Sequence, residues 1–313
     1  MVRSVVSQDT NTPADRGIPP VVLLQDIGHG RGSYVASRVS KDQKLLEIGG
    51  SYNPVFSKAD GYDLYTADHD TQDNLVAKYR AYHPDPAAAD RIQPVDFVVA
   101  DGDLDRAIGE EHAGSFDIVF SSHNLEHIPN PIAHLRSIER ILAPDGVFLV
   151  VVPDKRGCFD LLRPLSTAGQ WIEAYLEPQP FHALRTLYDA DGYSVASGDK
   201  IVWNGDEVFD GVRSASGLSV GDCLDLIRRT RATYRDAHAW VFTPHSCLLM
   251  LLEMNALGLV GLYPRAVLSD GNGEFVVELT KSRPVPIGND RRVALLARAC
   301  REQAEAHMRL PAA

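Results

Sequence analysis

The segment LLEIGGSYNP, residues 45–54, joins an apolar run to an acid and two adjacent glycines. Its aliphatic residues are typical of a buried strand, whereas a carboxylate and paired glycines do not favour strand structure. In a doubly wound α/β sheet, ligands bind beyond the carboxyl ends of the strands, where a glycine turn lets the backbone approach them closely. The segment alone is a weak signal, because it lacks both a complete GxGxG pattern and a P-loop lysine. A tight turn that binds no ligand is therefore an alternative interpretation of this segment.

Apolar runs like that of residues 44–49 recur through the first half of the chain. They are short, continuous and rich in Val, Ile, Leu and Phe, which indicates strands buried on both faces and hence a parallel sheet. Helical patterns separate them at residues 71–82 and 131–146. The further strands are expected at residues 62–68, 94–101, 116–122 and 146–154. Alternating strands and helices predict a doubly wound α/β fold.

The pattern changes after residue 154. Helical patches follow at residues 167–177 and 219–237, without clear strand alternation. The turn DGNG, residues 270–273, then separates two β-rich runs and is a strong hairpin signal. A helix is expected at 244–258, strands at 259–269 and 274–282, and a last helix at 291–308.

These patterns divide the chain into four parts. We expect a flexible N-terminal arm over residues 1–24, a cofactor-binding core over 25–154, a helical insertion or cover over 155–239, and the C-terminal part of the core over 240–313. The arm is expected because the first twenty residues are polar and contain proline.

Composition narrows the classes of partner. The 313 residues are 44% hydrophobic and 23% charged, which is typical of a globular protein with a sizeable core. The net charge is −11 without a basic stripe, which argues against nucleic acid or an anionic membrane as a partner. Four widely spaced cysteines indicate reduced thiols and a cytoplasmic protein. The sequence shows no membrane span or signal peptide, and it leaves a homodimer open.

Two further acids end neighbouring strands. Asp68 follows the second strand, roughly twenty residues after Glu47, which is the spacing at which an acid reaches ribose hydroxyls in nucleotide-binding folds. Asp101 ends the third strand and is followed by Gly102. Three strands that end in an acid at one sheet edge are poorly explained by solubility, so this edge is the expected cofactor site.

With these motifs the sequence resembles the class I S-adenosylmethionine-dependent methyltransferases, closely over residues 43–153 and more loosely over the final hairpin. The most specific part is FDIVFSSHNLEHIPNPIAHLRSIERILAPDGVFLVVVP, residues 116–153. The resemblance implies a seven-stranded Rossmann-like sheet with a C-terminal antiparallel hairpin and a helical insertion. It also implies S-adenosylmethionine (SAM) as cofactor and S-adenosylhomocysteine as product.

The resemblance assigns roles at the cofactor edge. Glu47 and Gly49 would line the methionine part, and Asp68 would bind the ribose. Asp101 would meet the adenine amino group, and Ser122 would lie beside the sulfonium. The full set of expected cofactor-binding residues is Glu47, Gly49, Gly50, Asn53, Asp68, Asp101, Gly102 and Ser122. The sequence departs from the family at Gly50-Ser51-Tyr52-Asn53, where another glycine is usual.

Methyl transfer requires an aligned nucleophile and usually the removal of its proton. The segment SSHNLEHIP places His123, Glu126 and His127 at i, i+3 and i+4, which one helical turn would present on one face. HxxEH also matches the inverted zinc-protease motif, which we reject because the segment follows a sheet strand in a nucleotide-binding context. A general base, a divalent metal site and a structural role stay open.

The segment also resembles ubiquinone-pathway O-methyltransferases, which hold a metal with an acid-acid-His set at these positions. His123 replaces the first acid here, so the metal candidates are His123, Glu126 and His127, and Mg2+ stays open as a second cofactor. In HAWVFTP, residues 238–244, His238 and Trp240 are candidate wall residues, with a packed structural histidine as the alternative. The catalytic candidates are His127, His123, Glu126, His238 and Asp154.

Three functions are compatible with these features. The first is an O-methyltransferase acting on a hydroxyl of a small-molecule or oligosaccharide acceptor, with a sugar or glycan precursor favoured. PDKRGCFDLLRP, residues 153–164, resembles segments of methyltransferases of polysaccharide biosynthesis, although such a charge run is usually a solvated loop. A methyltransferase of a natural-product phenol or carboxylate would have a mainly apolar pocket. A non-catalytic SAM-binding protein would have no ionisable group facing the sulfonium.

Overall fold

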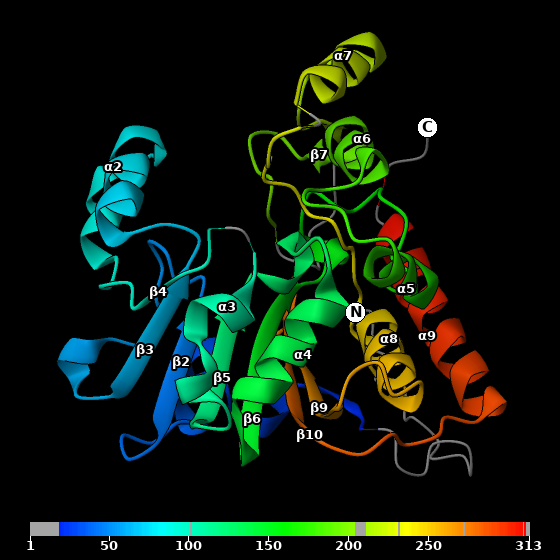
Figure 1. Cartoon of the computed structure of the whole chain (residues 1–313). Coiled ribbons are helices and arrows are strands. Elements are labelled where there is room, and N and C mark those ends of the chain that lie inside the picture. The colour runs from blue at the N-terminus through cyan, green and yellow to red at the C-terminus, as the bar shows by residue number, and fades with distance from the viewer. Residues whose placement is uncertain are drawn as a thin grey trace.

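The computed structural model describes residues 19–100, 102–203, 211–230, 232–271, 273–308 and 310. Its central element is an eight-stranded sheet with the strand order β1-β9-β10-β6-β5-β2-β3-β4 (Figure 1). The strands are β1 Val21–Leu23, β2 Lys44–Ile48, β3 Asp63–Asp68, β4 Phe97–Val98, β5 Phe116–Ser122, β6 Leu142–Pro153, β9 Leu262–Ser269 and β10 Glu274–Lys281.

Pairing within the sheet confirms the predicted parallel core and C-terminal hairpin. Strands β2 to β6 pair in parallel, whereas β10 runs antiparallel to both β6 and β9. The predicted count of seven strands is one short, because β1 pairs with the edge strand β9. Val21–Leu23 was expected within the flexible arm, but it covers hydrogen-bonding groups that an edge strand would otherwise expose. Residues 1–18 of that arm lie outside the described residues.

Prolines account for two boundary differences. The helix expected over residues 131–146 is α4 Pro131–Ile141, and β6 begins at Leu142. Pro144 disfavours helical conformation in the residue before it and removes a backbone donor, so the helix ends earlier than the pattern suggests. The strand expected over 94–101 is reduced to Phe97–Val98, since Pro94 cannot donate to the sheet.

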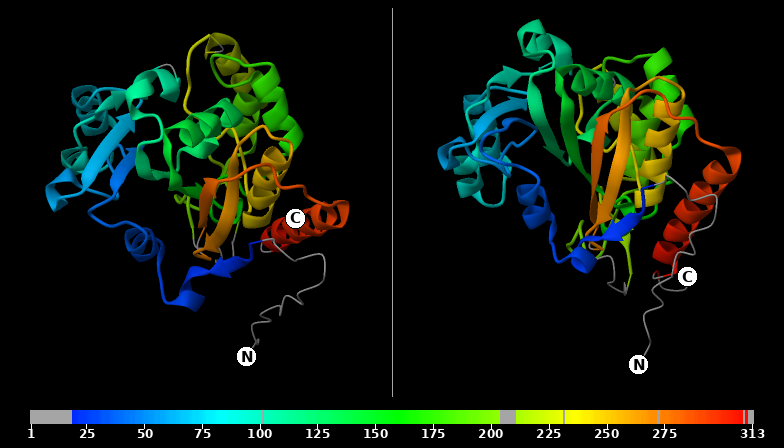
Figure 2. Two further views of the ribbon diagram at one scale, coloured as in Figure 1. Left: turned by 60° about the horizontal axis from the view of Figure 1, so that its bottom comes forward. Right: turned by 90° about the horizontal axis from the view of Figure 1, so that it is seen from below.

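Helices cover both faces of the sheet. They are α1 Arg31–Ser37, α2 Gln72–Tyr82, α3 Leu104–Ile108, α4, α5 Ala168–Leu176, α6 Leu184–Tyr193, α7 Val220–Thr230, α8 Pro244–Ala256 and α9 Asn289–His307. Short 3-10 helices lie at Leu24–Ile27, Lys58–Asp60, Pro86–Arg91, Glu110–His112, Leu125–His127 and Lys155–Gly157. α9 lies along the outer side of α8 (Figure 2). Among the described residues, no helix is long and apolar enough to cross a membrane.

Alternation along β2 divides the core into two layers. Leu46 and Ile48 pack with α4 and α8 on one face, whereas Leu45 packs with Tyr34 and Val35 of α1 on the other. This is the expected consequence of side chains pointing to opposite faces at successive strand positions. Glu47 shares the face of Leu45, so its carboxylate is buried beneath the loop that follows the strand.

The insertion contains α5, α6, α7 and a small antiparallel pair, β7 Val195–Ala196 with β8 Arg213–Ser214. Figure 1 shows these elements above the sheet edge at which the parallel strands end. Trp171 of α5 is fully buried in the main core, with its ring 6.2 Å from that of Trp240. The insertion therefore shares its packing with the sheet domain.

Replacing Tyr34 with Phe should lower the free energy of unfolding by about 1.5 to 3 kcal/mol, the usual contribution of a hydrogen bond to a charged group. The Tyr34 hydroxyl donates to Glu278 Oε1 at 2.7 Å and ties α1 to β10. Chemical denaturation measures the difference. Tyr82→Phe, at an exposed position, is the matched control and should stay within about 0.5 kcal/mol of the parent.

Candidate active site

The glycine turn after β2 is fixed by its surroundings. Gly49 has a φ of +70°, and a Cβ there would lie 3.3 Å from Asn124 Nδ2. A Cβ on Gly50 would lie 3.2 Å from Glu47 Cδ. A side chain at either position would thus crowd the sheet edge between β3 and β5, which explains why two glycines follow an acid at this point.

Glu47 braces the loop that follows this turn. Its carboxylate accepts backbone hydrogen bonds from Val55 N at 2.7 Å and Phe56 N at 3.3 Å. Burial raises the pKa of Glu47 to about 7, although these two bonds act in the opposite direction. The acid in the opening segment therefore stabilises the turn, and its expected contact with the methionine part stays a prediction.

Asp68 lies directly beside the turn at the end of β3. Its Oδ2 accepts a hydrogen bond from Ser51 N at 3.0 Å, and its Oδ1 accepts one from His69 N at 2.8 Å. The side chain is nearly buried, and Oδ2 keeps a second lone pair for a ligand hydroxyl.

The other expected cofactor residues differ in their surroundings, and one of them lies outside the described residues. Asp101 lies outside the described residues, and Gly102 follows it with a φ of +77°. Asn53 is exposed and donates its N–H to Gly50 O at 2.9 Å, which closes the turn. Ser122 is the last residue of β5. Asn124, which sequence reasoning missed, has a buried Oδ1 without a hydrogen-bond partner among the described residues.

The carboxylate of Glu126 is surrounded by three histidines. Glu126 Oε1 lies 3.5 Å from His123 Nδ1, 3.7 Å from His127 Nε2 and 3.9 Å from His238 Nε2. Glu126 is completely buried, and neither of its oxygens has a hydrogen-bond partner within the described part of the chain. We call Glu126 and these three histidines the histidine cluster.

The local backbone differs from the single helical turn expected for HxxEH. A 3-10 helix covers only Leu125–His127, and His123 precedes it with a φ of +49°. His123 N donates to Val151 O at 3.0 Å, so this residue still belongs to the edge of the sheet. The His123 ring thus reaches Glu126 from the strand side.

Each histidine of the cluster has a second carboxylate at its other ring nitrogen. The distances are 2.8 Å for His123 Nε2 to Glu274, 2.8 Å for His127 Nδ1 to Asp236, and 2.6 Å for His238 Nδ1 to Asp160. These acids come from β10, from the loop before α8, and from the segment after β6. Apart from the 238–244 motif, no local pattern in the sequence predicts these long-range contacts.

The cluster favours ionised groups. Burial lowers the pKa of His123, but contact with Glu126 and Glu274 outweighs this effect and raises it to about 9. Burial raises the pKa of Glu126, but the three histidines lower it by more than burial raises it. The net shift is therefore downward. The surrounding rings therefore favour the ionised carboxylate of Glu126.

The charge run after β6 is partly buried, unlike an ordinary solvated loop. Arg163 Nη1 donates to Asp160 Oδ1 at 2.7 Å, and Arg163 Nη2 donates to His238 O at 2.9 Å. Asp160, Arg163 and His238 are all less than a tenth exposed. Asp154, a catalytic candidate, instead accepts two hydrogen bonds of 2.9 Å from Arg156 Nε. Its carboxylate is occupied by that guanidinium.

The donor atoms that converge as a metal group are not those expected. Glu126, His127 and His238 each offer one atom, and these atoms lie within 4.8 Å of one another. His123 is not part of this group, and His238 takes its place. The i, i+3, i+4 spacing suggested His123 as a metal ligand. Because His123 is held at the end of β5, its ring approaches Glu126 from the strand side.

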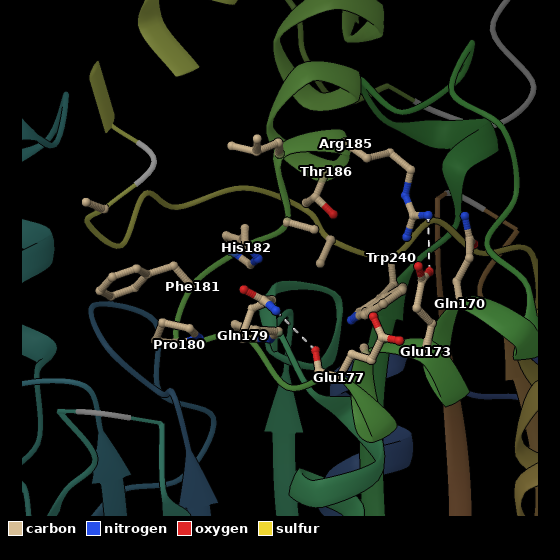
Figure 3. Close-up of a pocket in the computed structure, with 16 residues that line it drawn as sticks. Gln170, Glu173, Glu177, Gln179, Pro180, Phe181, His182, Arg185, Thr186 and Trp240 are labelled. Atoms are coloured by element: carbon tan, nitrogen blue, oxygen red, sulfur yellow. Dashed lines mark hydrogen bonds and ion pairs between the residues drawn. The ribbon is translucent and has the colours of Figure 1, made fainter. Parts of the chain in front are cut away.

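A pocket of about 570 Å³ adjoins the histidine cluster. It is lined by Pro129, Gln170, Glu173, Ala174, Glu177, Gln179, Pro180, Phe181, His182, Ala183, Leu184, Arg185, Thr186, Ala232, Ala239 and Trp240. Ala239 N donates to Glu126 O, so the pocket wall is tied to the cluster. Figure 3 shows Arg185 facing Glu173, and their charged groups lie 3.4 Å apart.

His182 is a pocket residue that the sequence analysis did not select. It is buried, and neither of its ring nitrogens has a hydrogen-bond partner among the described residues. Burial and the nearby charge of His127 lower the pKa of His182 to about 4. A neutral imidazole therefore stands in the pocket wall, able to accept or donate one hydrogen bond.

Comparison with protein families identifies the class of protein. Residues 26–197 match the model of a methyltransferase domain, which is more than half of the chain. The chain belongs to this methyltransferase family, and the predicted class of enzyme is confirmed. A search of curated proteins found no match.

Solved structures were also compared with the whole chain. The methyltransferase CalH in complex with SAH is 15% identical, covering 79% of this chain and 54% of that chain at a TM-score of 0.38. The chain thus spans about half the length of that structure. CcbJ from Streptomyces caelestis is 14% identical, covering 80% and 93% at a TM-score of 0.40. A putative SAM-dependent methyltransferase from Listeria monocytogenes is 10% identical, covering 80% and 97% at 0.41.

Proposed function

We propose that the protein is a SAM-dependent O-methyltransferase that acts on a hydroxyl of a sugar or glycan precursor. The observation that carries this proposal is a pocket lined by both polar and apolar residues, whose wall is joined to a buried cluster of ionisable side chains by the hydrogen bond from Ala239 N to Glu126 O. Such an enzyme would work in polysaccharide biosynthesis in the cytoplasm.

The residues at the glycine turn fit SAM. Gly49 leaves the end of β2 open, and Asp68 retains an acceptor lone pair beside it. The unpartnered Oδ1 of Asn124 suits the ammonium group of the cofactor's methionine part. We propose that Asp68 holds the ribose and that Gly49 and Asn124 hold the methionine part. When bound, SAM supplies an electrophilic methyl group on a sulfonium leaving group.

The histidine cluster would handle the proton of the acceptor. A hydroxyl is too weak an acid to ionise unaided near neutral pH, and imidazole is the side chain best suited to accept its proton. Glu126 stabilises the imidazolium forms of His123 and His127, so the neutral base would become available as the pH rises toward the His123 pKa of about 9. The elements α5 to α7 above the site would exclude water from the reacting groups.

The pocket wall favours a carbohydrate over the alternatives. Gln170, Glu173 and Arg185 supply hydrogen-bonding groups, and Phe181 and Trp240 supply flat apolar surfaces. A natural-product phenol would favour a mainly apolar wall, whereas polar and apolar residues line this pocket in similar numbers. The ionisable cluster also argues against a protein that binds SAM without catalysis.

The test is incubation with SAM labelled in its methyl group and a panel of acceptors. Monosaccharides and oligosaccharides should become labelled, whereas phenols and carboxylic acids should not. Label found only in phenols or acids would replace the sugar with the second substrate class. Binding of SAM without transfer to any acceptor class would support the non-catalytic alternative.

Asp68→Ala should weaken SAM binding by about 1.5 to 3 kcal/mol, or about 10- to 150-fold, because a buried-edge carboxylate that accepts ribose hydroxyls is lost. Titration calorimetry measures the affinity. Asp63→Ala, at the exposed start of the same strand, is the matched control and should bind SAM normally. Unchanged affinity in Asp68→Ala would remove this residue from the cofactor site.

A further inference from the structure

The gap around Glu126 Oε1 has the size of a metal ion. Elsewhere in the chain, histidines pair directly with carboxylates, as in His245 with Glu302 at 2.6 Å. At Glu126, however, His127 Nε2 and His238 Nε2 stop at 3.7 and 3.9 Å. Donor atoms bound to one ion at about 2.1 Å lie about 3.0 to 3.4 Å apart. The two distances to Glu126 are close to this range, and the three donor atoms, which lie within 4.8 Å of one another, would draw together around an ion.

The two histidines are oriented as metal ligands. His238 Nδ1 faces Asp160, and His127 Nδ1 faces Asp236. The hydrogen bond between His238 Nδ1 and Asp160 fixes the tautomer that leaves the Nε2 lone pair available. At His127 the nearby charge of Asp236 favours a proton on Nδ1, although the 2.8 Å contact lacks hydrogen-bond geometry. In both rings Nε2 is the nitrogen turned toward Glu126.

The buried carboxylate of Glu126 supplies a second, independent indication. It is completely buried and has no hydrogen-bond partner among the described residues, although burial of a charge without close partners is costly. A cation in contact with Oε1 would satisfy it.

We propose that Glu126, His127 and His238 bind one divalent transition-metal ion of the Zn2+ class. Two imidazoles and one carboxylate are a donor set for such ions, whereas Mg2+ prefers oxygen ligands and retains water. The Mg2+ left open by the sequence is therefore not the ion that this site fits. Three protein ligands leave coordination positions open for water or a substrate oxygen.

In catalysis, a role that rests on the proposed function, the ion would bind the acceptor hydroxyl and lower its pKa. The released proton would pass to solvent water. The new oxygen–carbon bond forms as the sulfur–carbon bond of SAM breaks, and the sulfur keeps the electron pair. Metal binding itself needs neither SAM nor acceptor and can be measured separately.

The experiment uses the untagged full-length protein after removal of bound metal by a chelator. Zn2+ titration calorimetry and elemental analysis after dialysis should give one ion per chain, and Mg2+ in large excess should not displace it. His238→Ala and Glu126→Gln should each weaken Zn2+ binding by at least 100-fold. Asp160→Asn removes the negative charge that supports His238 and also pairs with Arg163, and it should weaken Zn2+ binding by about 10- to 100-fold.

His245→Ala is the matched control, since this histidine also pairs with a carboxylate but does not face Glu126. It should bind Zn2+ normally. Circular dichroism establishes that each variant is folded, and thermal melting should show stabilisation of the parent but not of His238→Ala by Zn2+. The proposal is overturned if the folded His238→Ala variant binds Zn2+ as tightly as the parent, or if the parent retains no ion. Labelled-methyl transfer without metal binding would overturn this proposal and leave the proposed function intact.

Discussion

His127→Ala and His123→Ala should each lower turnover by about 100- to 10,000-fold, the usual loss when a general base or its equivalent is removed. Both rings lie within 4 Å of the same Glu126 oxygen, so each variant disrupts the groups that handle the acceptor's proton. SAM affinity should change by no more than a few-fold, because the glycine turn and Asp68 are left intact. Single-turnover measurements with saturating labelled SAM separate the two quantities.

His245→Ala is again the appropriate comparison, because it removes a partly buried histidine paired with Glu302 outside the cluster. Its turnover should remain near that of the parent. If both cluster variants keep near-normal turnover, the base must be another group, and His238 is then the next candidate. Asp154 is a weaker one, since Arg156 already occupies its carboxylate.

If the cluster binds a metal ion, the losses of turnover in His127→Ala and His123→Ala have different causes that can be measured. His127 would be a ligand, so His127→Ala should lose both turnover and Zn2+ binding. His123 would not be a ligand, so His123→Ala should lose turnover while Zn2+ binding persists. A chelator should abolish activity in the parent if the ion takes part in the reaction, whereas a simple histidine base would be indifferent to it.

Elements with strong local patterns could be predicted from the sequence. The runs at residues 44–49 and 116–122 are strands because continuous apolar residues suit a sheet covered on both faces. The hairpin around residues 270–273 follows from turn chemistry. α6 was missed because Asp189, Asp191 and Gly192 are poor helix formers. β1 was missed because three residues next to a polar arm become a strand only through contact with β9.

The candidate site shows the same division. His123, Glu126 and His127 could be selected because they are close in the sequence. Asp160 and Asp236, in contrast, lie 78 and 109 positions from the histidines that they contact, His238 and His127, and local spacing does not indicate these contacts. His123 stays a predicted metal candidate, but its ring is placed by the bond between His123 N and Val151 O, which local spacing does not reveal.

Arg163→Met should lower the free energy of unfolding by about 3 to 5 kcal/mol, because it leaves the buried carboxylate of Asp160 without its guanidinium partner. The pair is 2.7 Å long and almost fully buried at both ends. Chemical denaturation at neutral pH measures the loss. Arg140→Met breaks the more exposed pair with Asp105 and should cost less than about 1 kcal/mol.

The double variant Arg163→Met with Asp160→Leu separates the stability of this network from its use in the site. Removing both charges should restore much of the stability, since no isolated buried charge remains. Turnover should nevertheless stay low, because His238 Nδ1 loses the Asp160 oxygen that fixes its tautomer and turns Nε2 toward Glu126. A stable double variant with normal turnover would show that Asp160 serves only the fold. An unstable one would show that the shape of the pair, and not its charge balance, holds this segment in place.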